Sequence, residues 1–421
     1  MYPLKLTMIS EPLFIWAYLP GESAPVVAGK LQVAATPTGH VGSFTYGKSY
    51  LGNPNALALD PVALPLSAQF FSFTALKGIP GVILDACPDR WGIRAINRLI
   101  GEQPYPAGYL LLNDPGRVGN LAFSLRADLP PVELKSREFA LTELLVAAEA
   151  LEKDDVIDHE LIKALHPGTG GARPKCNIVF EDAVWIGKFP SADDPLRLSM
   201  PRLEHATMQL AKACGIDVAE TRLISVGEKD VCLVRRFDRH IGCNLTQQCS
   251  INRLAFISAR SVFYADTEFR ATAMGSYARL ARWLPRYAIS QDGALQLFRR
   301  MVFNAAVRNT DDHELNHGLV YSPEQRAFQL SPAYDLLPSL HSHRISQHAL
   351  LMGDNADGTL ENLVSACAAF GLTRDEALKI IWEIAQIVQA QWDSVLYACG
   401  FGDDAISRLR HCFAPLPLRR E

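Results

Sequence analysis

The stretch of sequence that decides the fold runs from Asn309 to Asp335. It begins Asn309-Thr310-Asp311-Asp312-His313-Glu314-Leu315-Asn316, passes through the apolar segment Gly318-Leu319-Val320-Tyr321, and ends Leu330-Ser331-Pro332-Ala333-Tyr334-Asp335. It therefore carries one carboxylate, an amide five residues later, and a second carboxylate after a segment that we expect to form a β-hairpin. Carboxylate and amide oxygens are hard ligands of the kind that hold Mg²⁺, so the segment is a candidate phosphate-handling site.

The same order of groups serves phosphoryl transfer in protein kinases. There, an Asp orients the attacking hydroxyl, and an Asn and a second Asp hold magnesium against the phosphates. Because phosphoryl transfer depends mostly on positioning and charge neutralisation, a few oxygen ligands on a rigid loop can suffice. A polar surface turn could use the same residue types, since Asp and Asn bond to their own backbone. The kinase hypothesis therefore depends on parts found elsewhere in the chain.

Length and composition describe a globular protein with more than one lobe. The chain has 421 residues, above the size at which a single core stops growing, so two or three domains or lobes are expected. Hydrophobic residues make up 48% and charged residues 20%, and the net charge of −4 gives no support for a strongly basic nucleic-acid surface. Nine cysteines without a CxxC pair favour a reducing compartment. No apolar stretch approaches the roughly 18 residues that span a bilayer, and the N-terminus is a poor signal peptide, so we expect a cytoplasmic protein.

The pattern along the chain predicts a β-rich half followed by a helical half. Short strands are expected between about residues 12 and 75, and a helix is expected from Leu141 to Leu151. Further helices are expected over Glu361 to Phe370 and over Thr373 to Cys399, the second with a capping box and with Ile380, Ile384, Ile387, Val395 and their neighbours on one face. These features predict a bilobal α+β protein with a protein-kinase-like fold and a site in the cleft between lobes. The expected domains are a β-rich subdomain at 1–135, a kinase N-lobe at 136–238 and a helical C-lobe at 239–421.

A glycine-rich segment upstream is a candidate phosphate-binding loop. It reads Gly168-Thr169-Gly170-Gly171-Ala172-Arg173-Pro174-Lys175, and glycines allow backbone N–H groups to approach an anion closely. A predicted β-hairpin follows, with Lys188 near the end of its second strand. The segment is not a Walker A loop, because the Gly-Lys-Ser/Thr ending and the following helix are absent. A glycine-rich hairpin without any ligand would look the same, and a strand Lys is often only a solvated edge residue.

Two further parts follow in the order that a kinase requires. Glu204 lies in the first turn of a predicted helix, where it could be a partner of the helix dipole or the partner of Lys188. A predicted strand, Val231 to Asp238, suits the segment that joins the lobes, where backbone groups can read adenine. The combination of these parts is more specific than any one of them.

In this combination the chain resembles the HipA family, the serine/threonine kinase toxins of bacterial type II toxin–antitoxin systems. The similarity covers nearly the whole chain. Asp85 to Gly92 with Arg117-Val118-Gly119 resembles the N-terminal subdomain of the family, and the kinase signatures are matched by Gly170 to Lys175, Val234 to Asp238, Asn309 to Asn316 and Pro332 to Asp335. The resemblance implies that ATP and Mg²⁺ bind here and that a protein is phosphorylated, with a translation component as one candidate substrate.

The resemblance also implies a role for each matched residue. Asp311 would be the catalytic base, Asn316 and Asp335 would bind Mg²⁺, and Lys188 would contact the ATP phosphates and pair with Glu204. The loop over the phosphates would comprise Gly170, Gly171, Ala172, Arg173, Pro174 and Lys175. Adenine would be faced by Arg235, Arg236 and Phe237, and the site would also be lined by His313 and Tyr334.

Two departures from the family pattern concern regulation and activity. Many members have a serine in the glycine-rich loop whose phosphorylation shuts the kinase down, and here that position is Gly168. Thr169 is one residue away, so any self-phosphorylation in the loop is expected there. The family also often has Lys before the metal-binding Asn, where this chain has Leu315, which removes a positive charge beside the site.

Other classes of function agree less well with these residues than a kinase does. A catalytically weak, kinase-like protein that binds ATP and a partner protein would explain the departures, but not the presence of all the candidate catalytic residues. A transition-metal site would need a histidine spacing that the sequence does not show. Nothing indicates a helix-turn-helix, so DNA would be contacted through a separate antitoxin partner.

Overall fold

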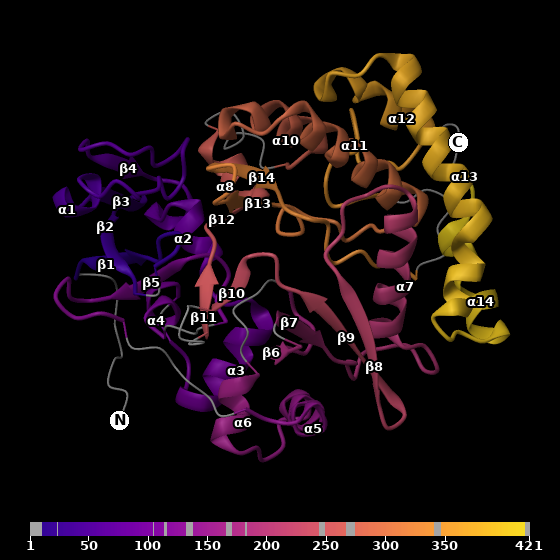
Figure 1. The fold of residues 1–421 in the computed structure, drawn as a ribbon, viewed down its shortest axis with the longest axis horizontal. Coiled ribbons are helices and arrows are strands. Elements are labelled where there is room, and N and C mark those ends of the chain that lie inside the picture. Colours follow the sequence, from indigo (N-terminus) through magenta and orange to yellow (C-terminus); the bar gives the residue numbers. More distant parts are fainter. Residues whose placement is uncertain are drawn as a thin grey trace. The chain divides into compact units, whose positions relative to one another are not determined.

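The chain forms two compact units, each built from separate segments of sequence. The computed structural model describes residues 11–22, 24–103, 105–112, 116–131, 138–165, 171–181, 183–243, 249–266, 274–340 and 347–416. The first unit comprises Met1–Ala192, Arg235–Ala265 and Val320–Arg326, and the second comprises Asp193–Val234, Asp266–Leu319 and Ala327–Glu421. The N-terminal part is rich in sheet and the C-terminal part is mostly helical, which confirms the predicted α+β class (Figure 1).

A five-stranded antiparallel sheet lies at the start of the first unit, with strand order β4-β3-β2-β1-β5 (Figure 1). The strands are β1 (Leu13–Ala17), β2 (Val26–Thr36), β3 (Gly39–Tyr46), β4 (Phe71–Phe73) and β5 (Leu121–Ser124). Leu13 pairs with Leu31, which pairs with Phe44, and all three side chains are buried on one face. Gly42 has no room for a side chain, because an added Cβ would lie 1.5 Å from the carbonyl oxygen of Gly78. The glycine thus allows the turn around residue 78 to lie against β3.

Helices and short strands complete the first unit. The helices are α1 (Lys48–Leu51), η1 (Leu76–Gly78), α2 (Gly81–Asp85), α3 (Arg90–Ile100), α4 (Ala107–Leu110), α5 (Leu141–Glu152), α6 (His159–Ala164) and α8 (Ala259–Ala265). The predicted hairpin is present as β6 (Lys175–Phe180) and β7 (Ala183–Lys188), and a second antiparallel pair is formed by β10 (Arg239–Cys243) and β11 (Cys249–Arg253). β12 (Phe256–Ser258) leads into α8, and Asp85 at the end of α2 accepts hydrogen bonds from Ser258 and Ser261.

The second unit begins with helix α7 and an antiparallel hairpin. α7 (Met200–Ala213) is capped by the hydroxyl of Ser199 and has Pro201 in its first turn, where the missing N–H is tolerated. β8 (Thr221–Val226) and β9 (Lys229–Arg235) follow. The remaining elements are α10 (Tyr277–Trp283), η2 (Leu284–Tyr287), α11 (Gln291–Ala306), β13 (Gly318–Ser322), β14 (Ala327–Leu330), α12 (Leu360–Ser365), η3 (Cys367–Phe370), α13 (Arg374–Ala398), α14 (Asp403–Leu409) and η4 (Arg410–Phe413); β13 runs on into the first unit from Val320.

Helix α13 is the longest element and packs on α7 and α11 (Figure 1). The predicted capping box is present, since the Thr373 hydroxyl and the Glu376 carboxylate each bond the other residue's backbone N–H. Ile384 of the predicted apolar face is buried, whereas Ile380, Ile387 and Val395 are half-buried beside buried neighbours. The buried side chains are Ala377, Ile381, Ile384, Val388, Trp392 and Leu396. No helix among the described residues is long and apolar enough to cross a membrane.

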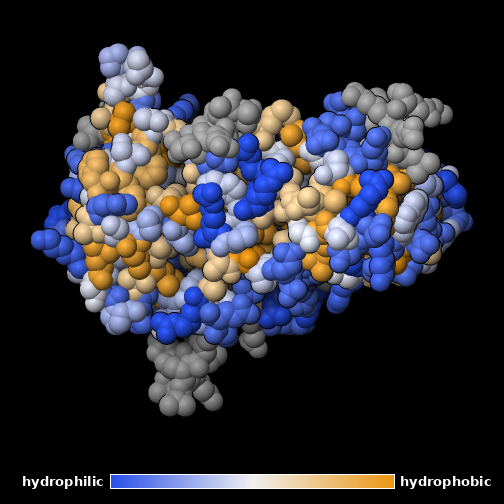
Figure 2. Space-filling view, turned by 90° about the horizontal axis from the view of Figure 1, so that it is seen from above, coloured by the Kyte–Doolittle hydropathy of each residue, from blue (hydrophilic) through white to orange (hydrophobic). Residues whose placement is uncertain are grey.

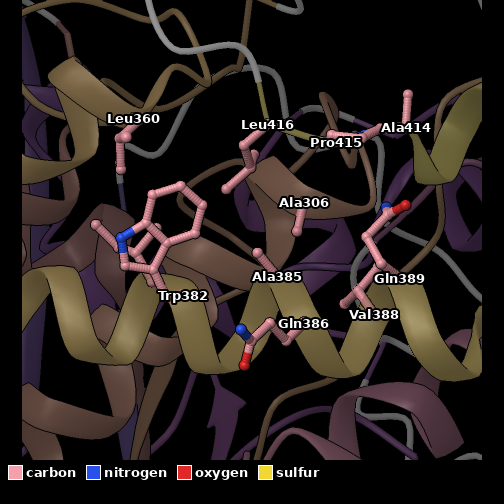
Figure 3. Close-up of a pocket in the computed structure, with 11 residues that line it drawn as sticks. Ala306, Leu360, Trp382, Ala385, Gln386, Val388, Gln389, Ala414, Pro415 and Leu416 are labelled. Atoms are coloured by element: carbon pink, nitrogen blue, oxygen red, sulfur yellow. The ribbon is translucent and has the colours of Figure 1, made fainter.

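An apolar pocket of about 240 Å³ lies in the second unit between α13 and the segment after η4. Figure 3 shows the Trp382 ring and Leu416 above the α13 residues that form the pocket floor. The face drawn in Figure 2 carries hydrophilic and apolar residues side by side, as expected from the mixed composition. None of the residues that line the pocket was predicted to handle phosphate.

Candidate active site

The segment from Asn309 to His317 forms a loop between the end of α11 and β13. Helix α11 ends because the N–H of Asn309 bonds the carbonyl of Asn304 (2.8 Å) and Arg308 takes a positive φ of 56°. The Asn309 amide also donates to the side-chain oxygen of Asn304 (3.0 Å), and both residues are buried. We call residues 309–317 the catalytic loop. Its start is thereby fixed to a helix of the core.

Four residues of the catalytic loop are buried, and Asn316, at 6% exposure, is one of them. Asn309, Asp312 and His317 are 2%, 1% and 2% exposed. The Tyr277 hydroxyl donates to Asp312 Oδ2, and His317 Nε2–H donates to the same oxygen (2.7 Å). Asn304 Nδ2 donates to the Tyr277 hydroxyl (2.9 Å), so α10, α11 and the loop share one chain of hydrogen bonds. We call Tyr277, Asn304, Asn309, Asp312 and His317 the polar cluster.

The electrostatics of the polar cluster keep Asp312 ionised and Tyr277 protonated. Burial raises the pKa of Asp312, but the imidazole of His317 and the hydrogen bonds from His317 and Tyr277 outweigh it, so the pKa lies below its ordinary value. Burial and the Asp312 charge raise the pKa of Tyr277 well above its ordinary value. The hydroxyl therefore remains a donor and the carboxylate an acceptor at neutral pH.

A neutral histidine donates a hydrogen bond to the backbone at the start of the catalytic loop. His348 donates from Nδ1 to the carbonyl of Asn309 (2.9 Å), and burial lowers the pKa of His348 to about 4. Thr310 and Ser339 share a hydroxyl–hydroxyl hydrogen bond, and the carbonyl of Thr310 accepts from the N–H of Ala349 (3.0 Å). These contacts hold the backbone on the N-terminal side of Asp311.

Asp311 differs from its neighbour Asp312 in exposure. Asp311 is exposed, whereas Asp312 is buried and accepts two hydrogen bonds. Of these two carboxylates, Asp311 is therefore the one that a substrate can reach. The structure therefore gives the two adjacent carboxylates different surroundings.

A hydrogen bond joins the two segments that carry the candidate metal ligands. The Tyr334 hydroxyl donates to the carbonyl of Leu315 (2.8 Å), and each partner lies one residue before a candidate ligand, Asp335 or Asn316. The Asn316 amide nitrogen lies 3.4 Å from the carbonyl oxygen of Asp311, which leaves the amide oxygen as the atom suited to a metal. An amide oxygen and a carboxylate fit Mg²⁺ by donor type.

The segment that carries Asp335 is anchored by its main chain. Ala333 pairs with Val218 as a parallel bridge, with its N–H bonded to the carbonyl of Asp217 (2.8 Å), and buried Arg300 donates to the carbonyl of Ser331. Asp335 has a φ of +60°, a left-handed conformation that is unfavourable for most side chains and better tolerated by Asp and Asn. Strain of this kind persists where the surrounding structure fixes it, and it is frequent at functional sites.

His313 also belongs to this part of the second unit. Its Nδ1 accepts the N–H of Leu315 (3.2 Å), and its carbonyl accepts the N–H of Asn316 (2.9 Å). His313 thus shapes the turn that presents Asn316. The structure brings together the predicted residues of the catalytic loop with the Tyr334–Asp335 segment, all within the second unit.

The glycine-rich loop and its flanks belong to the first unit. Gly168, Thr169 and Gly170 lie outside the described residues, whereas Gly171, Ala172, Arg173 and Pro174 precede β6. Lys175 is the first residue of β6 and is buried with its Nζ 2.9 Å from the carboxylate of Asp89. Burial raises the pKa of Asp89 against the opposing charge of Lys175.

The segment at Asp89 holds both flanks of the glycine-rich loop. Asp89 caps α3 by accepting the N–H of Gly92 (2.6 Å) while it binds Lys175. The Trp91 indole N–H lies 2.7 Å from the carbonyl of Leu165 and 2.9 Å from that of Lys175. Residues on the two sides of the loop therefore meet at one side chain.

Lys188 ends β7, as predicted, and is directly opposite Lys175 in the hairpin register. Two opposed lysines on one face of a hairpin would repel each other, and the Asp89 carboxylate offsets the charge of Lys175. Glu204 is a buried residue of α7 in the second unit. The predicted pairing of Lys188 with Glu204 joins residues of different units and stays a prediction.

The predicted adenine-facing residues differ in their surroundings. Arg235 is exposed, and the Phe237 ring lies 6.2 Å from that of Phe256. Arg236 is buried, with two hydrogen bonds to the Asp238 carboxylate (2.9 and 2.7 Å) and one to the side chain of Asn177 (2.8 Å). The guanidinium of Arg236 thus holds the end of β9 to the β6–β7 hairpin inside the first unit.

Comparison with known proteins gives a family match that includes parts of both units. Residues 168–392, more than half of the chain, match the family model of the HipA-like C-terminal domain. A Sinorhizobium fredii protein named "Putative kinase Y4dM" is 31% identical over 185 residues, 41% of this chain and 39% of that protein. A Haemophilus influenzae protein named "Putative kinase" is 26% identical over 176 residues, 37% of this chain and 48% of that protein. The matches span less than half the length of either curated relative.

A solved structure shares the fold over nearly the whole chain. It is a chain from the complex of HipA, HipB and operator DNA of the Shewanella oneidensis MR-1 toxin–antitoxin system, with a TM-score of 0.64, 18% identity and 95% of each chain covered. At this identity the likeness shows the fold alone. Together with the family match, it shows that this protein belongs to the HipA family of kinase-like proteins.

Proposed function

We propose that the protein is an ATP- and magnesium-dependent serine/threonine protein kinase that acts as the toxin of a type II toxin–antitoxin module. Its substrate would be a protein, with a translation component as one candidate. Family membership supports a kinase or kinase-like protein, and the geometry of the catalytic loop supports the chemistry. The observation that carries the proposal is that Asp311 is exposed next to Asp312, which is buried and hydrogen-bonded. The same loop is hydrogen-bonded to the segment that ends at Asp335.

In the proposed reaction, Asp311 accepts a hydrogen bond from the substrate hydroxyl and aims its oxygen at the terminal phosphate of ATP. The bond from this oxygen to phosphorus forms as the bond from phosphorus to the ADP oxygen breaks, and the hydroxyl proton passes to Asp311. Magnesium, when bound, would neutralise charge on the phosphates. Asn316 and Asp335 would hold the metal, and Lys188 would contact the phosphates.

A partner is part of the proposal. The related Shewanella oneidensis HipA was solved together with HipB and operator DNA. A corresponding antitoxin would bind this protein and carry its contact with DNA, in agreement with the net charge of −4.

The second candidate is a catalytically weak, kinase-like protein that binds ATP and a partner protein. It is favoured by Leu315, which stands where the family often has Lys and whose carbonyl is used by Tyr334. Nucleotide turnover separates the two candidates, because both would bind ATP.

Nucleotide affinity with and without magnesium tests the site. Titration calorimetry would compare the wild type, Asp335→Ala and Asp354→Ala, the last a control that removes an exposed carboxylate outside the site. We expect magnesium to strengthen ATP binding in the wild type and in the control, and we expect that effect to be lost in Asp335→Ala, because a hard oxygen ligand is missing. Equal magnesium dependence in all three proteins would remove Asp335 from the site. A growth assay tests the toxin assignment. Expression of the wild type without an antitoxin should arrest growth, and expression of Asp311→Ala should not.

A further inference from the structure

We propose that Tyr277 is a positioning residue for Asp311, because it holds Asp312 in place and thereby orients the neighbouring carboxylate. The inference rests on the proposed kinase function and adds to it a residue that does not touch the substrate. Tyr277 lies at the start of α10, 34 positions before Asp311 in the sequence.

The polar cluster fixes the catalytic loop at its start, middle and end. Asn309 is bound by Asn304 at the start, Asp312 by Tyr277 in the middle, and His317 by Asp312 at the end. All of these bonds lie within the second unit and all of these side chains are buried. Side chains that point outward from such a frame, as Asp311 does, take their direction from it.

Loss of the Tyr277 hydroxyl would remove one of only two hydrogen-bond donors that the Asp312 side chain has among the described residues. Tyr277 and His317 both donate to the same carboxylate oxygen, Oδ2. The other oxygen, Oδ1, is buried and has no hydrogen-bond partner within the described part of the chain. A buried carboxylate depends on its donors, since each must replace the water that it has lost. Loss of the Tyr277 hydroxyl would leave His317 as the remaining donor to Oδ2 among the described residues.

Movement of Asp312 would displace Asp311, because the two residues are joined by one peptide bond. Consecutive Cα atoms are held about 3.8 Å apart by a planar peptide, so rotation or retreat of Asp312 moves Asp311 with it. A displacement of about 1 Å at a reacting group can lower a rate by about 10²-fold without any change in the chemistry available. In the proposed reaction Asp311 contacts the substrate hydroxyl and not the nucleotide, so the effect would fall on kcat.

The test is Tyr277→Phe, which removes one hydroxyl and keeps the ring that packs edge-on to His317 with centroids 5.2 Å apart. Tyr50→Phe is the matched control, because Tyr50 is also buried and its hydroxyl donates to a carbonyl, that of Leu57, at 2.8 Å. We expect kcat of Tyr277→Phe to fall about 10-fold or more while KM for Mg-ATP stays within about twofold. The control should match the wild type in both constants.

The double variant asks whether the effect passes through Asp311. In the Asp311→Ala background, Tyr277→Phe should lower kcat no further, because there is no carboxylate left to orient. A kcat for Tyr277→Phe within twofold of the wild type, or a second full loss in the double variant, would overturn the proposal.

Hydrogen exchange separates this inference from the kinase assignment. Amides of residues 310–316 should exchange faster in Tyr277→Phe than in the wild type or Tyr50→Phe, whether or not the protein transfers phosphate. If the wild type transfers no phosphate, the proposed function fails. Unchanged exchange in the loop would then still count against the positioning role, and faster exchange would support it.

Discussion

The adjacent residues Asp311 and Asp312 should respond very differently to the same substitution. Asp312→Ala leaves the Tyr277 hydroxyl and the His317 N–H without their shared buried acceptor. Each buried donor that is left without an acceptor costs about 1–3 kcal/mol, so the loss of the acceptor for two donors destabilises the protein by about 2–6 kcal/mol. Asp311 is exposed, and substitution of an exposed residue changes the free energy of unfolding by about 0.5 kcal/mol or less.

These energies convert into separate melting temperatures. At about 2–4 °C per kcal/mol for domains of about 150–250 residues, Asp312→Ala should melt about 10 °C below the wild type, and Asp311→Ala within about 2 °C of it. Thermal melts followed by circular dichroism would measure both, and phosphate transfer would be measured below the lower melting temperature. Both variants should lose activity, one with its fold weakened and one with its fold intact. Equal melting temperatures for the two variants would refute the assignment of separate roles.

Three other predictions concern a buried histidine, a buried ion pair and the glycine-rich loop. Burial lowers the pKa of His348 from 6.5 to about 4, so between these pH values the unfolded chain binds a proton that the folded chain does not, and the free energy of unfolding falls by about 3 kcal/mol as pH drops from about 6.5 to about 4. The variant His348→Asn can still donate to Asn309 but does not titrate, so urea unfolding should show that this part of the pH dependence is removed. An unchanged pH dependence in the variant would contradict the prediction. Lys175→Met should lower the melting temperature by leaving the buried Asp89 carboxylate without its ammonium, and adding Asp89→Asn should restore part of the loss; a further drop would contradict the ion pair. Self-phosphorylation in the glycine-rich loop, if peptide mapping detects it after incubation with Mg-ATP, should fall on Thr169 and vanish in Thr169→Val, and a phosphate that persists elsewhere would exclude a switch in this loop.

Local sequence signals predicted several elements correctly. Two apolar segments on either side of a turn predict the β6–β7 hairpin with Lys188 near its end, and the capping box and amphipathic pattern predict α13. The apolar residues of α13 stand in adjacent pairs, such as Ile380-Ile381 and Ile387-Val388, which form two neighbouring stripes on the helix. Packing against α7 and α11 selects the second stripe, and no local pattern encodes that choice.

The helix predicted from Glu361 to Phe370 is divided in the structure. α12 ends at Ser365, whose hydroxyl bonds the carbonyl of Asn362 (2.7 Å), and a 3₁₀ turn follows from Cys367 to Phe370. Serine hydroxyls that bond back to the preceding turn compete with helix geometry, and helices often tighten into 3₁₀ turns near their ends. The apolar periodicity continued across this break, so it could not reveal it.

The parts of the site that lie close together in the sequence could be predicted, and the contacts between distant residues could not. The catalytic loop and the Tyr334–Asp335 segment could be read as carboxylates and amides at a spacing suited to phosphoryl transfer. The Asp-Asp pair gave no sign that one carboxylate would be buried. Tyr277 and His348 lie 35 and 36 positions from Asp312, and contacts across such separations cannot be read from one sequence.

Transfer of phosphate from ATP to a protein should depend on Asp311, and radiolabelled ATP measures this transfer. Purified wild type, Asp311→Ala and the control Asp354→Ala would each be incubated with magnesium, labelled ATP and a cell lysate, and labelled proteins would be identified by mass spectrometry. The account predicts labelled serine or threonine in a lysate protein with the wild type and with Asp354→Ala, and a rate about 10²-fold or more lower with folded Asp311→Ala. Equal labelling by folded Asp311→Ala and the wild type would contradict it.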